Sequence, residues 1–127
     1  MIVRSLDEIT DTERDVRAEQ WRAKRLFLRD DGLGFSLSET TVAAGAEMRI
    51  WYKHHSEACF VIEGEAELTE RDSGVVHRLV AGSAYAPEHD RHDIRVISEL
   101  RLVCVFNPAL TGREMHDADG SYLPAKG

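Results

Sequence analysis

Short segments with strand-like alternation, separated by turn residues, follow one another along almost the whole chain. Residues 21–29 and 35–42 both read as strands, and an Asp-Asp-Gly sequence at residues 30–32 turns the chain between them. About ten such segments reach as far as residue 106, at regular spacing and with hardly any helical periodicity. This pattern predicts an all-β sandwich or barrel with very little helix.

The two ends of the chain differ from this pattern. Residues 1–6 alternate like a short edge strand, and the charge-rich residues 7–19 favour a polar turn with a short helix. Residues 107–127 are too polar for a core, yet they are rich in side chains with specific chemistry. We expect this C-terminal segment to fold over the barrel mouth as a lid, either a loop or a short helix, with its last residues mobile.

Length, charge and composition limit the possible functions. At 127 residues, with no linker rich in Pro, Gly or Ser, the chain is expected to form a single domain over residues 1–127. It has no apolar run long enough to cross a bilayer and no signal-peptide pattern, so we expect a cytoplasmic protein without a membrane partner. The net charge of −7, without a basic stripe, argues against nucleic-acid binding. In that compartment Cys59 and Cys104 are expected to be reduced rather than bridged.

Residues 51–64, W-Y-K-H-H-S-E-A-C-F-V-I-E-G, contain the first candidate for chemistry. From Glu57 onward the side chains alternate, so that Glu57, Cys59 and Val61 share one face of a strand. We expect Gly64 to end this strand. The strand is apolar on both faces, and a carboxylate buried there is costly unless a cation or hydrogen bonds satisfy it. Glu57 is therefore a candidate metal ligand.

A second segment, G-S-A-Y-A-P-E-H-D-R-H at residues 82–92, again brings ligand-type side chains to the end of a strand. Together the two segments resemble the paired motifs of the cupin family, whose fold is a double-stranded β-helix or jelly-roll barrel. The matching residues are Glu57 and Gly64 in the first motif and Gly82, Pro87 and His92 in the second. The histidine pair of the usual first motif is missing, because His54 and His55 are adjacent and too close to Glu57. Each of these two histidines is more often a surface hydrogen-bonding residue than a ligand.

Beyond the cupin motifs, the chain resembles the ectoine synthase family along nearly its whole length. Seven matching stretches occur in order and in register. They are M-I-V-R-S-L (1–6), W-x-x-x-R-L (21–26), G-F-S-x-x-x-T-T (34–41), Y-K-H-H-x-E-A (52–58), I-E-G-E (62–65), C-V-F-N-P (104–108) and L-T-G-x-E-x-H-x-x-D-G-S-Y (110–122). Each stretch alone is weak, but seven in one order are specific.

The resemblance implies an activity, a cofactor and an assembly. Members of the family are carbon–oxygen hydro-lyases that convert N-γ-acetyl-L-2,4-diaminobutyrate to ectoine, a compatible solute made under osmotic stress. The family implies iron (Fe²⁺) and a cupin homodimer. Its metal ligands fall here on Glu57, Tyr85 and His92. Because the segment after Tyr85 is one residue shorter than in the family, His89 remains an alternative to His92. Two oxygens and one imidazole suit ferrous iron and leave open positions for a substrate.

The resemblance also implies the substrate contacts. They fall on Trp21, Arg25, Ser38, Thr40, Cys104, Phe106, Glu114 and His116. Arg25 is expected to pair with the substrate carboxylate and Glu114 to hold the α-amine, while His116 or Tyr85 relays protons. Which of Tyr85, Glu114 and His116 is the catalytic acid and which the base stays open. From the residues alone, an arginine such as Arg25 is more often a solvated strand residue, and a carboxylate such as Glu114 is more often a solvated loop residue.

Two other functions are compatible with the sequence. One is a different iron-dependent cupin enzyme, such as a dioxygenase that acts on a small amino acid or thiol. The other is a non-catalytic cupin that binds a small solute. Oxygen consumption would distinguish the first from a cyclodehydration, and ligand binding that survives metal removal would indicate the second.

Overall fold

Two long strands run through the whole structure and hold its parts together. In the computed structural model, β5 (Ser56–Glu70) and β8 (His92–Asn107) pair antiparallel along their full length. β8 also pairs with β4 (Glu47–Ile50) through its first half and with β3 (Ser36–Val42) through its second half. Both halves of the fold therefore share one pair of strands.

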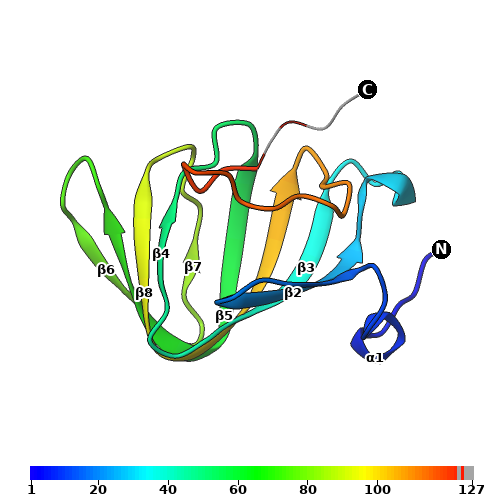
Figure 1. Cartoon of the computed structure of the whole chain (residues 1–127), viewed down its shortest axis with the longest axis horizontal. Coiled ribbons are helices and arrows are strands. Elements are labelled where there is room, and N and C mark those ends of the chain that lie inside the picture. Colours follow the sequence, from blue (N-terminus) through cyan, green and yellow to red (C-terminus); the bar gives the residue numbers. More distant parts are fainter. Residues whose placement is uncertain (123, 125–127) are drawn as a thin grey trace.

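The structure describes residues 1–122 and 124. The strands form one curved antiparallel sheet (Figure 1). Its order is β1-β2-β3-β8-β5-β6, with β4 beside β8 and β7 beside β5. The other elements are β1 Asp15–Arg17, β2 Trp21–Phe27, β6 Val76–Leu79, β7 Ala84–Tyr85, helix α1 Leu6–Ile9 and a 3-10 turn, η1, at Arg29–Asp31. The predicted all-β class with very little helix is confirmed. No helix among these residues is long and apolar enough to cross a membrane.

The sheet bends sharply where β5 passes Gly64. The register between β5 and β8 shifts here, and Gly64 has φ +98°. A Cβ at this position would lie 2.1 Å from the carbonyl oxygen of Glu99 on β8, so only glycine allows the two strands to approach this closely. The expectation that Gly64 ends the strand is wrong, since the glycine bends it and β5 continues to Glu70. For the same reason, several of the short strands predicted from the sequence are merged into the two long ones.

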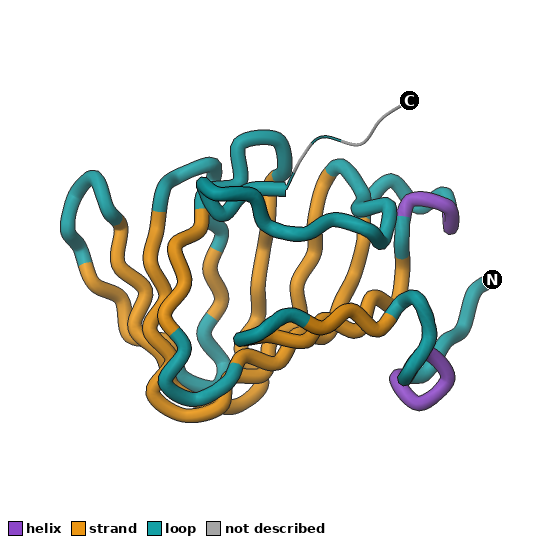
Figure 2. The backbone as a smooth tube through the Cα atoms, in the orientation of Figure 1, coloured by secondary structure: helices purple, strands orange, loops and turns teal. Residues whose placement is uncertain are grey.

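The bend gives the sheet an inner, concave face and an outer, exposed face (Figure 2). The core lies on the inner face, where alternate residues of β8 are buried, namely Leu100, Leu102, Cys104 and Phe106. On β5, Cys59 and Val61 are buried in the same way, whereas Phe60 on the outer face is 51 % exposed. The inner face thus collects the side chains from which a site can be built.

The N-terminal residues do not form the predicted edge strand. Met1–Ser5 lie outside any strand, and α1 begins at Leu6, with the Ser5 hydroxyl accepting a hydrogen bond from the Glu8 backbone N–H at 3.2 Å. The segment is held instead by Arg4, which donates to both oxygens of Asp31 at 2.8 and 2.7 Å. A bidentate ion pair therefore replaces the backbone ladder that the alternation predicted.

The segment after β8 crosses the open side of the curved sheet, orange to red in Figure 1. Its first part is tied to η1, the turn after β2, because the Arg29 N–H donates to the Leu110 carbonyl at 2.8 Å. Its last described part is tied to the other side, because the Trp51 N–H donates to the Gly120 carbonyl at 3.0 Å. The segment thus roofs the concave face. Of the predicted lid over residues 107–127, Leu123 and residues 125–127 lie outside the described part.

Candidate functional site

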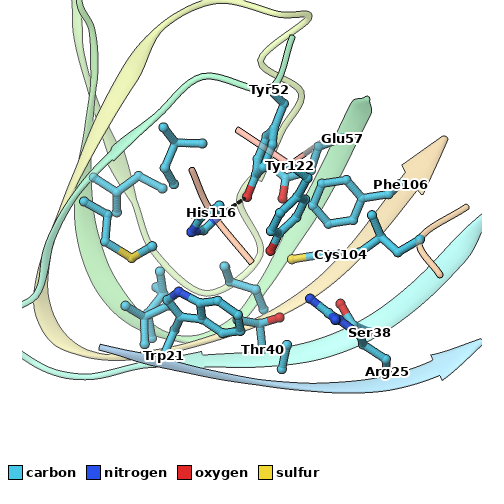
Figure 3. A pocket seen from close by; sticks show the side chains of 18 of the residues that line it. Trp21, Arg25, Ser38, Thr40, Tyr52, Glu57, Cys104, Phe106, His116 and Tyr122 are labelled. Carbon is cyan, nitrogen blue, oxygen red and sulfur yellow. Dashed lines mark hydrogen bonds between the residues drawn. The ribbon is translucent and has the colours of Figure 1, made fainter. Parts of the chain in front are cut away.

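The concave face and the C-terminal segment enclose a small cavity of about 50 Å³. Its lining includes seven of the eight predicted substrate residues, Trp21, Arg25, Ser38, Thr40, Cys104, Phe106 and His116, together with Glu57 (Figure 3). Tyr85 lines the cavity as well. Glu114 is outside this lining and borders a neighbouring surface cleft instead. His92 is also outside it and lines another cleft, on which Tyr85 lies as well.

Strand register explains why these side chains meet. Arg25 on β2 pairs with Ser38 on β3, Ser38 pairs with Cys104 on β8, and Cys104 pairs with Cys59 on β5. Cys59 in turn pairs with Tyr85 on β7. Five residues from distant parts of the sequence therefore form one row across the sheet. Since paired residues point to the same face, the row presents a cation, a hydroxyl, two thiols and a phenol to one side.

Arg25 is a buried cation with unused hydrogen-bond donors. Its side chain is 1 % exposed, and Nη2 donates to the Glu114 carbonyl oxygen at 3.1 Å. Within the described residues, Nε and Nη1 have no partner. The guanidinium carbon lies 6.0 Å from the centre of the Tyr122 ring. A buried guanidinium with two free donor groups is suited to bind an anionic group, and a carboxylate matches it in shape.

Glu57 and Tyr85 contribute two oxygens to the cavity. Burial raises the pKa of Glu57 to about 7, although a hydrogen bond with Cys59 works in the opposite direction. Burial, together with the neighbouring Cys59 and Glu57, raises the pKa of Tyr85. No ion pair engages Glu57 among the residues that the structure describes. Burial thus favours the neutral forms of both groups unless a cation stabilises their charged forms.

His92 has the hydrogen bonding of a metal-binding imidazole. It is 1 % exposed, and Nδ1 lies 2.9 Å from the Asp90 carbonyl oxygen, to which it can donate. This leaves Nε2 as the lone-pair nitrogen, and in the described chain Nε2 has no partner. The ring centre is 6.4 Å from that of Tyr85. His89, the alternative, is exposed, and its Nδ1 is 2.9 Å from the Tyr52 carbonyl oxygen.

The two acid–base candidates of the C-terminal segment have different surroundings. The Glu114 carboxylate accepts hydrogen bonds from the backbone N–H groups of Thr111, Gly112 and Arg113 at 2.8, 2.9 and 3.1 Å. Burial raises the pKa of Glu114, but these bonds outweigh it and the net pKa is lowered. His116 points into the cavity with Nε2 2.8 Å from the Tyr52 hydroxyl. Burial lowers the pKa of His116 to about 4, so the ring is neutral at neutral pH.

Three further residues shape the site and were missed in the sequence. Tyr122 stacks on His116 with ring centres 4.6 Å apart, and Figure 3 shows it among the cavity side chains. Tyr52 lines the cavity beside both of them. His55 is not a surface residue as expected, since it is 1 % exposed and its ring faces Phe106 and Tyr122 edge-on. Both tyrosines stand in the stretches that resemble the known family, but no strand alternation marks them as inward-facing.

Comparisons with known proteins show the family of this chain. A family model described as ectoine synthase matches residues 1–126. The chain belongs to the ectoine synthase family. The L-ectoine synthase of Saccharopolyspora erythraea is 50 % identical over 123 residues, covering 96 % of this chain and 91 % of that protein. That of Mycolicibacterium vanbaalenii is 50 % identical over 126 residues, covering 98 % and 97 %.

Solved structures lead to the same family and confirm the predicted cupin fold. The crystal structure of ectoine synthase from P. lautus has a TM-score of 0.88 and 46 % identity, covering 99 % of this chain and 92 % of that one. An RmlC-like cupin from Shewanella frigidimarina has a TM-score of 0.61 at 23 % identity, covering 75 % and 82 %, which shows a shared fold alone. The family resemblance read from seven short stretches is thus confirmed over the whole chain.

Proposed function

We propose that this protein is an L-ectoine synthase, a hydro-lyase that closes N-γ-acetyl-L-2,4-diaminobutyrate to ectoine with loss of water. Membership of the family supports the reaction class. The observation that carries the proposal is the buried Arg25 guanidinium with two free donor groups, on the row of residues beneath the cavity. A small amino acid offers the carboxylate that such a group requires.

The chemistry of the three residues expected to hold iron(II) supports a metal site. Glu57, Tyr85 and His92 offer a carboxylate without an ion pair, a phenol and an imidazole whose Nε2 is free within the described chain. The ring of Tyr85 lies beside that of His92 and lines the same cavity as Glu57, so Tyr85 connects the other two. The exposed His89 has no such position. Bound iron would supply Lewis acidity towards the acetyl oxygen and would stabilise Tyr85 as phenolate.

The remaining side chains would bind and orient the substrate. Arg25 takes the carboxylate, while Trp21, Thr40 and Phe106 wall the cavity and keep the chain of the substrate curled. Curling brings the α-amine to the acetyl carbon, which gives the proximity contribution of an intramolecular reaction. His116, neutral and aimed into the cavity, is placed to accept the proton of the ammonium group.

Glu114 would act on a different part of the site. Its carboxylate is bound to its own loop, and its carbonyl oxygen accepts the hydrogen bond from Arg25. In this conformation Glu114 therefore holds the roofing segment against Arg25. To hold the α-amine, its carboxylate would first have to leave the loop.

The deciding experiment is an anaerobic assay of the purified protein with ferrous iron and N-γ-acetyl-L-2,4-diaminobutyrate. The cyclic product is followed by NMR, and a second sample contains a chelator. We expect product in the first sample and none in the second. Oxygen-dependent oxidation of the substrate would favour a dioxygenase, and tight substrate binding without product would favour a non-catalytic cupin.

A homodimer is proposed from the outer face of the sheet. Ala58 and Phe60 on β5 pair with Val105 and Val103 on β8, so four apolar residues adjoin on a face that this chain leaves partly exposed. A second copy of the chain would cover them. We expect a dimer in sedimentation velocity and a monomer for Phe60→Glu. Val76→Glu is the matched control, because Val76 is exposed on β6, beside the far end of β5. A cytoplasmic location stays a prediction.

A further inference from the structure

The two cysteines of the chain lie side by side on the two neighbouring central strands of the sheet. Cys59 on β5 is the direct partner of Cys104 on β8, and both side chains are buried, at 3 % and 4 % exposure. Their Sγ atoms lie 3.2 Å apart, and both thiols are free. Glu57 precedes Cys59 by two residues on the same face of β5. One ligand atom from each of the three residues lies within 4.8 Å of the other two.

We propose that Glu57, Cys59 and Cys104 form a second metal site, selective for a thiophilic divalent cation such as Zn²⁺ or Cd²⁺. Two thiolates and one carboxylate are ligands that zinc accepts, whereas ferrous iron is served by the oxygen and imidazole set of Tyr85 and His92. Three protein ligands leave a fourth position. Because Glu57 and Cys104 both line the cavity, that position opens towards it.

The geometry needs little adjustment to hold such an ion. A zinc–sulfur bond is about 2.3 Å long, so tetrahedral coordination sets the two sulfurs about 3.8 Å apart. The sulfurs are now 3.2 Å apart, and small rotations about the side-chain bonds of the two cysteines separate them enough. The backbone of two central, fully paired strands stays in place. Each thiol releases its proton to solvent as its sulfur binds the cation.

Because both sites use Glu57, a metal ion bound at the thiolate site affects the proposed iron site. The Glu57 carboxylate belongs to both ligand sets, so a cation held by the two thiolates takes Glu57 away from Tyr85 and His92. The two sites therefore exclude each other, and the identity of the cation decides which of them fills. The thiolate site itself does not depend on the proposed ectoine synthase activity.

Cobalt(II) is the probe for this site, because a thiolate bound to Co²⁺ gives an intense charge-transfer band in the near ultraviolet. The full-length protein is titrated anaerobically with Co²⁺ after a thiol count under denaturing conditions has shown two reduced cysteines per chain. We expect the band to saturate at about one Co²⁺ per chain and to disappear when Zn²⁺ or Cd²⁺ is added. Since Cys59 and Cys104 are the two cysteines of the chain, a thiolate band reports on them.

Three variants assign the ligands. Cys59→Val is expected to lose the band while keeping its far-ultraviolet circular dichroism, and Glu57→Gln to need at least tenfold more Co²⁺. His92→Ala is the matched control and keeps the band, because His92 belongs to the iron set alone. Cobalt that binds the unmodified protein without a charge-transfer band overturns the proposal, whatever the variants do. A band that survives in Cys59→Val, or is lost in His92→Ala, overturns it as well.

Discussion

Replacing Arg25 by methionine is expected to leave the stability of this protein nearly unchanged and to lower its activity strongly. Arg25 is 1 % exposed, and two of its three guanidinium nitrogens lack a partner in the described chain. Methionine has similar length and needs no hydrogen bonds. Exchanging buried ions for apolar side chains is often neutral or stabilising, by about 1–4 kcal/mol. The hydrogen bond from Nη2 to the Glu114 carbonyl is lost, which costs about 1.5–3 kcal/mol. The two contributions nearly cancel without substrate.

The same substitution is expected to weaken substrate binding. If Arg25 binds the substrate carboxylate through its two free donor groups, the variant loses about 3–4 kcal/mol of binding free energy. This amounts to a fall of about 10²- to 10³-fold in kcat/KM. The carboxylate is held equally in the ground state and the transition state, so the loss is expected mainly in KM.

The assay combines urea unfolding, with and without substrate, and steady-state kinetics by NMR. We expect the free energy of unfolding of Arg25→Met to stay within about 1 kcal/mol of the unmodified protein. Substrate should stabilise the unmodified protein but not the variant. Lys24→Met, on the opposite face of β2, is the control and should change neither quantity. If Arg25→Met unfolds far more easily but keeps its KM, the guanidinium is structural and our reasoning fails.

Two further predictions concern stability. Gly64→Ala would place a Cβ 2.1 Å from the Glu99 carbonyl oxygen at φ +98°, and should lower the free energy of unfolding in urea by more than about 3 kcal/mol. Gly45→Ala, which has φ +83° but open space around it, should cost only about 1 kcal/mol, and equal losses would contradict the close approach. Folding lowers the pKa of His116 from 6.5 to about 4, so the unfolded chain binds more protons between these values. The free energy of unfolding should therefore fall by about 3 kcal/mol as the pH drops through this window. A pH dependence that His116→Gln leaves unchanged would refute the assignment.

The fold was predictable because strand alternation and turn residues depend on local sequence. The alternation placed Glu57, Cys59 and Val61 on one face, and the inner face of β5 confirms this. The bend at Gly64 was not predictable, because the reason for the glycine is the carbonyl of Glu99, which is distant in sequence. The same limit applies to the N-terminus, where an ion pair between Arg4 and Asp31 overrides the alternation of residues 1–6.

Apart from Glu57, which the strand pattern marked as a candidate metal ligand, the residues of the candidate site were predicted through the family resemblance. No pattern in residues 21–29 distinguishes Arg25 from a solvated arginine, since its burial depends on the C-terminal segment that covers it. His55 was expected at the surface and is buried. The neighbouring His54 is exposed, and the sequence of the pair gives no sign of which ring turns inward. Tyr122 becomes part of the site only when the chain returns across the sheet to stack on His116.

The size of the cavity places a constraint on how this site works. A volume of about 50 Å³ holds no more than a few water molecules, far less than an acetylated diamino acid needs. Much of the space beside Arg25 and His116 is taken by Tyr122, which is 5 % exposed and packs against Phe106 at 5.5 Å between ring centres. Tyr122 belongs to the roofing segment and not to the sheet. If substrate binds in this space, we expect it to enter by displacing Tyr122 of the roofing segment rather than the residues on the paired strands.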